Sequence, residues 1–117
     1  MKITLKGTPP SLNKFVGKMG GWEYRKEKQK WTTMVFFLGR AIRPPKPYTR
    51  ATVEITYYFP DRRRHDPDNY CGKFLLDGLT KAGIIEDDDF SHVRLGVMGE
   101  VDRDNPRTEI VVTEEHT

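Results

Sequence analysis

Cysteine is almost absent from this chain of 117 residues, since Cys71 is the only one. A single cysteine excludes an intrachain disulfide and fits a protein of the reducing cytosol. Long apolar runs are also absent, because no stretch approaches the roughly 20 apolar residues that a membrane-spanning helix needs. The first six residues are too polar for a signal peptide. We therefore expect a cytoplasmic protein with a single domain over residues 1–117.

Acidic residues are scarce in the first half of the chain and basic residues in the second. Up to Arg64 there are 15 Lys and Arg against 4 Asp and Glu, and from His65 onward there are 5 against 13. A basic half favours a polyanionic partner such as nucleic acid. An acidic half in the same domain has the ligands for metal ions. The alternative is that both sets are ordinary solvated surface charges.

Alternation and helical spacing predict an α+β domain in the order β-α-β-α-β-β. We expect a small mixed sheet covered by two helices. The link from strand to strand through a helix favours parallel pairing in part of the sheet, and the last two strands are expected to form a hairpin. The predicted strands are 2–7, 51–59, 91–101 and 107–113, the predicted helices are 23–41 and 67–82, and 9–22 is a long loop.

The most informative segment runs from Arg62 to Asn69, where three arginines and His65 precede Asp66 and Asp68. A second acidic group, Glu86 to Asp89, follows the predicted helix 67–82. That helix would be about 24 Å long, so the two acidic groups meet only if the chain turns back along it. If they meet, their carboxylates can hold one or two Mg²⁺ ions for displacement at a phosphodiester.

Each of these residues also has a purely structural interpretation. Asp66 is a good N-cap and Asp68 favours the helix dipole, while Asp87 to Asp89 can form a solvated turn. Lys73 lies close to the helical face of Asp66, where it could contact a phosphate or simply pair with Asp77. His65 is a candidate general acid or base, or a phosphate contact, although a lone histidine is more often neither.

Several linked motifs resemble the RusA family of Holliday junction resolvases, the crossover junction endodeoxyribonucleases. The chain carries His65-Asp66-Pro67-Asp68-Asn69, Lys73, Leu76-Asp77-Gly78-Leu79, Ala82-Gly83-Ile84-Ile85 and Asp87-Asp88. The match covers about 30 residues, and Pro10-Ser11-Leu12-Asn13 weakly resembles the opening of the family's first loop. The gap from Asn69 to Lys73 is one residue longer than in the best-known members, so Lys73 departs from the family spacing.

The resemblance implies a Mg²⁺-dependent homodimer, with Mn²⁺ as a substitute metal, that nicks four-way DNA junctions in pairs, from a bacterial or phage (often prophage) source. It assigns Asp66, Asp68 and Asp88 to the metal and Lys73 to catalysis, with Asp87 second to Asp88 and His65 accessory. Expected DNA contacts are Lys14, Lys18, Arg25, Lys26, Arg62, Arg63 and Arg64. The alternatives are a non-catalytic, structure-selective DNA-binding module of the same fold, or an unrelated adaptor domain.

Overall fold

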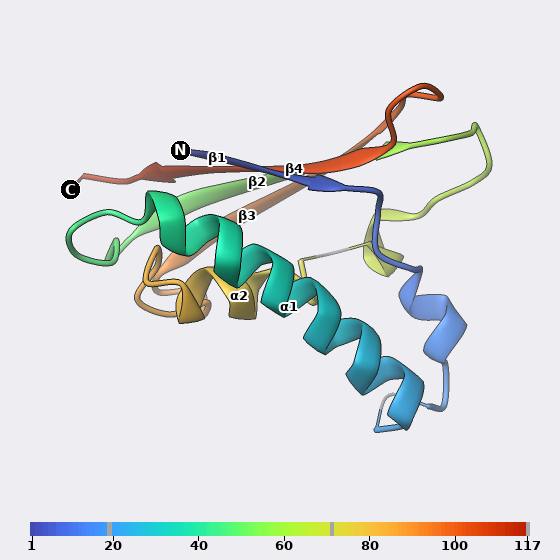
Figure 1. Cartoon of the computed structure of the whole chain (residues 1–117), viewed down its shortest axis with the longest axis horizontal. Helices are drawn as coiled ribbons and strands as arrows, with labels where there is room; N and C mark the ends of the chain where they lie inside the picture. Colours follow the sequence, from blue (N-terminus) through green and yellow to red (C-terminus); the bar gives the residue numbers. More distant parts are fainter. Residues whose placement is uncertain (19, 71, 117) are drawn as a thin grey trace.

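A four-stranded sheet with both helices on one face forms the body of the protein (Figure 1), in a computed structural model that describes residues 1–18, 20–70 and 72–116. The helices are α1 (Trp22–Ile42) and α2 (Leu76–Lys81). Two single 3₁₀ turns, η1 (Leu12–Phe15) and η2 (Pro67–Asn69), lie in the loops. The strands are β1 (Lys2–Lys6), β2 (Ala51–Phe59), β3 (Val93–Val101) and β4 (Arg107–Glu114).

The sheet order is β1-β4-β2-β3. Strands β2 and β3 are parallel, with Ala51 opposite Val93, while β4 is antiparallel to both β2 and β1. The predicted mixed sheet and its parallel pair are confirmed. The predicted hairpin of the last two strands is wrong, because β4 lies on the far side of β2. β4 pairs with β1 on one side and β2 on the other, and its alternating residues Thr108, Ile110 and Val112 are buried.

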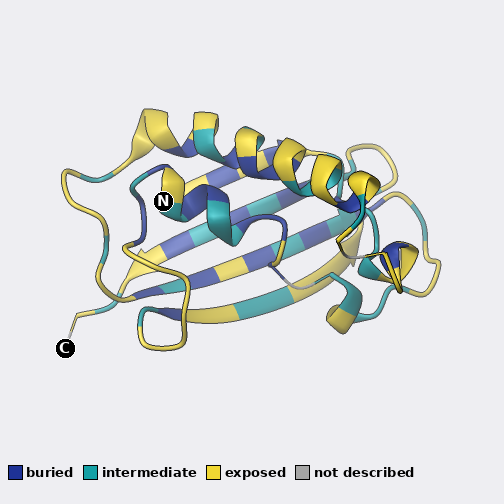
Figure 2. Ribbon diagram, turned by 90° about the horizontal axis from the view of Figure 1, so that it is seen from below, coloured by how far each residue is buried: buried dark blue, intermediate teal, exposed yellow. Residues whose placement is uncertain are grey.

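The core lies between the helix-facing side of the sheet and α1. In β2, the odd-numbered side chains from Ala51 to Phe59 are buried, and on α1 the side chains of Tyr24, Trp31 and Val35 face them. Figure 2 shows the exposed side of α1 turned away from the sheet. The helix predicted at 23–41 is confirmed with one more residue at each end.

The second helix, predicted over 67–82, is wrong in extent. Among the described residues of this segment, only η2 and the six residues of α2 are helical. In the segment between them, Phe74 packs against Tyr24 with ring centroids 5.6 Å apart and against Phe15 at 6.2 Å. A Cβ on Gly72 would lie 3.1 Å from Ile55, so the backbone here rests directly on the sheet. Tertiary packing has therefore overridden the helical pattern.

Two local predictions fail with that helix. Asp66 has extended backbone angles, and its carboxylate makes no capping hydrogen bond within the described chain. Asp77 pairs with Lys28 of α1, Oδ2 to Nζ at 3.1 Å, and not with Lys73. The charge of Asp77 is therefore matched across the contact between α1 and α2 and not along one helix.

Candidate metal and nucleic-acid site

The loop that carries Asp66 is held by aromatic packing. The His65 ring stacks on Phe59 with centroids 3.8 Å apart and planes 4° from parallel. Its Nδ1 lies 3.3 Å from the hydroxyl of Tyr70, and its Nε2 lies 3.5 Å from Asp61 Oδ1. These contacts hold His65 in the wall of the loop. Its position next to Asp66 in sequence therefore serves to fix the backbone from which the carboxylate projects.

Arg64 lies directly beside the Asp66 carboxylate. Its Nε donates a hydrogen bond of 3.0 Å to Asp66 Oδ1. This hydrogen bond and the charge of Asp66 raise the pKa of the guanidinium, and the charge of Asp68 raises it further. The Arg64 side chain is 87% exposed, so the rest of its guanidinium remains open to a phosphate. A carboxylate pair and an exposed arginine thus share one corner of the surface.

The acidic turn after α2 brings Asp88 close to other carboxylates. Partial burial raises the pKa of Asp88, and the charges of Asp77 and Asp87 raise it further. The backbone amide of Asp88 also binds Asp87 Oδ1 at 2.8 Å. Three carboxylates in this arrangement attract a cation, since a bound positive charge relieves their mutual repulsion.

We expect Asp88→Asn to raise the thermal unfolding midpoint at neutral pH. The folded chain holds the Asp88 proton more tightly than the unfolded chain, so the ionised group lowers stability above its pKa. Thermal denaturation at pH 7 without divalent metal measures the change, with Asp104→Asn in the exposed turn after β3 as the control. A lower midpoint for Asp88→Asn than for the control would contradict the expectation.

Both acidic groups lie beside β3. Asp66 borders a small hollow with Val97 and Met98, and Asp88 borders a groove with Val93 and Leu95. Leu95 and Val97 are two residues apart, about 7 Å along a strand. Because the continuous helix is absent, the two groups are not held at opposite ends of a 24 Å rod. Within the described residues, however, Asp66, Asp68 and Asp88 do not place their oxygens within mutual coordinating distance.

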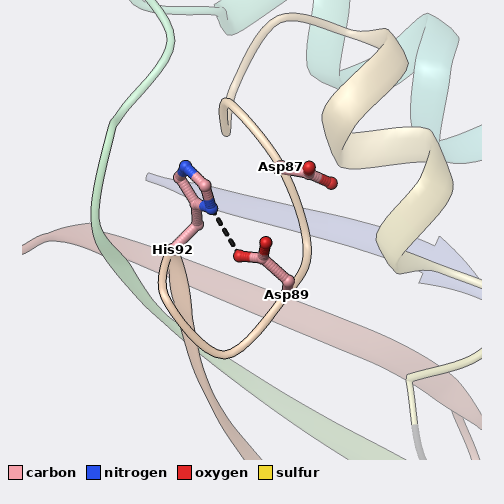
Figure 3. Close-up of side chains that lie close together, drawn as sticks. All are labelled: Asp87, Asp89 and His92. Atoms are coloured by element: carbon pink, nitrogen blue, oxygen red, sulfur yellow. Dashed lines mark hydrogen bonds and ion pairs between the residues drawn. The ribbon is translucent and has the colours of Figure 1, made fainter.

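A different trio does meet that geometric condition. Ligand atoms of Asp87, Asp89 and His92 all lie within 4.8 Å of one another. Figure 3 shows these three side chains gathered at the turn before β3. Asp89 and His92 are already engaged with each other, because His92 Nδ1 contacts Asp89 Oδ1 directly. Ser91 Oγ also donates to Asp89 Oδ1 at 2.8 Å. The pair closes the turn that leads into β3.

We expect this pair to make stability depend on pH. The hydrogen bond to Asp89 raises the pKa of His92 above its usual 6.5, so its contribution is full below that value and is lost as the pH rises through the raised pKa. Between pH 5.5 and 8.5, the thermal unfolding midpoint should therefore fall more steeply with pH for the wild type than for His92→Gln. His116→Gln, at an exposed position, is the control. Parallel curves for wild type and His92→Gln would refute the link.

The predicted basic contacts fall on three surfaces. Lys14 and Lys18 lie in or beside η1, and Lys26 lies over the exposed Trp22 ring, 5.0 Å from its centroid. Arg25 is on another side of α1, in the groove against α2. Arg62, Arg63 and Arg64 are all exposed in the loop after β2, and Lys73 is exposed in the turn before α2.

Sequence reasoning missed two further cations. Lys28 and Lys81 line the groove between α1 and α2 together with Arg25, with Asp77 among them. A signal was present in the sequence, since Arg25, Lys28 and Thr32 follow helical spacing along one stripe. Lys81 follows Asp77 by one helical turn. The groove adds positive charge on the same side of the sheet as the acidic residues.

Comparison with known proteins identifies the family. No protein-family model matches the chain. A curated relative, the crossover junction endodeoxyribonuclease RusA of Enterobacteria phage HK97, is 36% identical over 90 residues, and the match covers 74% of each chain. The chain belongs to the RusA family. The resemblance drawn from the motifs between His65 and Asp88 is thereby confirmed.

Two observations on this RusA-family chain bear on the metal that the family implies. Asp66, Asp68 and Asp88 offer carboxylate oxygens, the hard ligands that Mg²⁺ prefers. Partial burial raises the pKa of Asp88, and the neighbouring carboxylates raise it further, as expected of a site that gains from a cation. The residues therefore fit Mg²⁺ in chemistry.

None of the helices in the described ranges is long and apolar enough to cross a membrane.

Proposed function

We propose that this protein is a Mg²⁺-dependent endonuclease that resolves four-way DNA junctions by paired nicks, acting as a cytoplasmic homodimer. The observation that carries the proposal is its similarity to a crossover junction endodeoxyribonuclease over 74% of each chain. The acidic residues of the shared motif lie beside one strand, β3, from two different loops. Paired nicking needs two sites, which a two-fold dimer supplies.

Asp66, Asp68 and Asp88 would hold the metal, with Asp87 next to them as a further ligand. Bound there, Mg²⁺ or Mn²⁺ would supply Lewis-acid chemistry to activate water and to neutralise charge on the phosphate. Arg64 positions Asp66 through its hydrogen bond and presents its remaining donors to the DNA backbone. Lys73, exposed between η2 and α2, supplies positive charge to the phosphate.

A second candidate is a non-catalytic DNA-binding module of the same fold. Two observations favour it. Asp66, Asp68 and Asp88 are not gathered at coordinating distance among the described residues, and Asp66 forms an ion pair with Arg64. In that case the acidic residues have only structural roles, and the basic surfaces retain their function.

The two candidates separate in one experiment. Purified protein is incubated with a labelled four-way junction and with a linear duplex of matched sequence, in Mg²⁺ or in EDTA. We expect symmetric nicks in the junction alone, and their loss in EDTA. Tight junction binding without nicks, in Mg²⁺ and in Mn²⁺, would select the binding module. No affinity for either DNA near physiological salt would remove both candidates.

We expect the exposed arginines after β2 to bind mainly the DNA backbone. Replacing Arg62 and Arg63 with alanine should weaken junction binding and reduce the slope of log affinity against log salt by about 1 for each phosphate that the variant no longer neutralises. Binding titrations from about 50 to 200 mM salt measure the slope. Lys46→Ala, in the connector between α1 and β2, is the control. An unchanged slope in the double variant would place the DNA elsewhere.

A further inference from the structure

Strand β3 is an open edge of the sheet. It runs for nine residues in unbroken parallel register with β2 and has no strand on its other side in the described chain. Figure 2 shows it at the outer rim, with mostly exposed and intermediate residues. Natural proteins usually protect such edges with charged side chains, especially lysine, or with proline, a bulge or a short strand. β3 has nine residues in unbroken register and no lysine or proline, and its charged residues are Arg94 and Glu100, of opposite sign. The other edge, β1, has five residues and carries Lys2 and Lys6.

The free hydrogen-bonding groups of β3 belong to its odd-numbered residues. The carbonyl of His92 accepts from Ala51 of β2, and the amide of Asp102 donates to Phe59 of β2. Backbone groups of alternate residues point to opposite sides of a strand. Even-numbered residues therefore face β2, and residues 95, 97, 99 and 101 direct both amide and carbonyl outward.

Apolar side chains surround this edge. Leu95 is 41% exposed, Val101 is 45% exposed, and Phe90, in the turn before β3, is fully exposed. Leu95 and Val101 follow the same alternation as the buried Val93, so they lie on the helix-facing side of the sheet beyond the cover of the helices. Apolar surface next to an unpaired strand edge favours another protein chain as its partner.

The sequence of β3 is complementary to itself in one antiparallel register. With Val97 opposite its own copy, Arg94 faces Glu100 of the second chain, and symmetry repeats that pair. Leu95 then lies opposite Gly99 and Met98 opposite Gly96, so each large side chain meets a glycine. The charged pair occupies a position without backbone hydrogen bonds, where side chains approach most closely.

We propose that β3 pairs with β3 of a second copy of this chain, antiparallel and centred on Val97, so that one eight-stranded sheet runs through the dimer. Dimerisation is part of the function proposed above and the inference rests on it; the surface and the register are new. The two-fold axis is perpendicular to the sheet, so both helix layers lie on the same face. Asp66, which borders Val97 in the hollow beside β3, comes close to the axis in each subunit.

Charge reversal tests the register. Arg94→Glu and Glu100→Arg each place like charges opposite one another twice in the dimer, so each should raise the dissociation constant about tenfold, as measured by analytical ultracentrifugation. The double variant should restore association. Glu100→Arg leaves the existing ion pair of Arg94 with Glu115 in place, so its effect is separate from that pair. Lys6→Glu on β1 is the control and should change nothing.

Cross-linking gives a second readout. Val97→Cys should form a disulfide-linked dimer on mild oxidation, because paired Cα atoms at this position lie about 5.5 Å apart. Lys6→Cys should remain monomeric on the same non-reducing gel. The inference is refuted if the protein dimerises and neither charge reversal weakens the dimer. It is also refuted if the protein dimerises and Val97→Cys forms no disulfide-linked dimer.

The tests of the β3 interface do not depend on nuclease activity. A monomer that nicks junctions would refute the β3 interface and leave the nuclease standing. A β3 dimer that nicks no DNA in Mg²⁺ or Mn²⁺ would support the interface and refute the proposed function.

Discussion

Asp68→Asn should abolish junction nicking while junction affinity stays within a few-fold of the wild type. The substitution removes a negative ligand but keeps the size of the side chain. Loss of several kcal/mol of metal-derived transition-state stabilisation corresponds to about a 10³-fold lower rate. Single-turnover cleavage and equilibrium binding, both in Mg²⁺, measure the two quantities.

Asp104→Asn is the matched control, since this acidic residue lies in the exposed turn between β3 and β4. It should cleave like the wild type. Full cleavage by Asp68→Asn, in a preparation free of contaminating nuclease, would remove Asp68 from the proposed site. Equal loss of binding and cleavage would instead assign it to the structure of the loop.

Gly78→Ala should destabilise the fold by about 1–3 kcal/mol, the usual cost of overpacking a core. The added Cβ would lie 2.6 Å from Val35 Cβ and 2.9 Å from the backbone carbonyl oxygen of Thr32. Because one of these contacts is backbone, relief requires α2 to move away from α1. Chemical denaturation measures the change in the free energy of unfolding.

Gly20→Ala is the control, because a Cβ there meets no atom within 4 Å. It should leave the free energy of unfolding within a few tenths of a kcal/mol of the wild type. A stability of Gly78→Ala equal to that of the control would show that the α1–α2 packing is loose. Since α2 carries Asp77 beside Asp88, we also expect Gly78→Ala to disturb the pKa of Asp88.

The strands and α1 were predictable because their patterns are local. Val53, Ile55 and Tyr57 alternate over a half-buried strand, and Trp31 and Val35 repeat at helical spacing. The helix predicted at 67–82 also had a suitable pattern, but Phe74 joins an aromatic cluster with Phe15 and Tyr24, which are distant in sequence. That cluster depends on the tertiary fold, and no window of sequence contains it.

The sequence allowed candidate site residues to be named, but it did not predict how their side chains are arranged. The motif predicts Asp66, Asp68 and Asp88 as site residues, and these assignments stay predictions, while the family itself is shown by the curated relative. The role of His65 in stacking on Phe59 could not be predicted, because a histidine beside two aspartates has the same sequence signature whether it packs or titrates. Lys28 was missed because its partner Asp77 lies on a helix whose start was placed too early.

The position of β4 has a consequence for biosynthesis. β4 lies between β1 and β2, and in the described sheet β1 pairs with it alone, with Lys2 opposite Val111. The N-terminal amine also donates to the carbonyl of Val112 at 3.0 Å. A nascent chain on the ribosome therefore holds β1 without a partner until β4 has emerged. The four-stranded sheet can form only after β4 is available, so β1 stays unpaired and exposed until then.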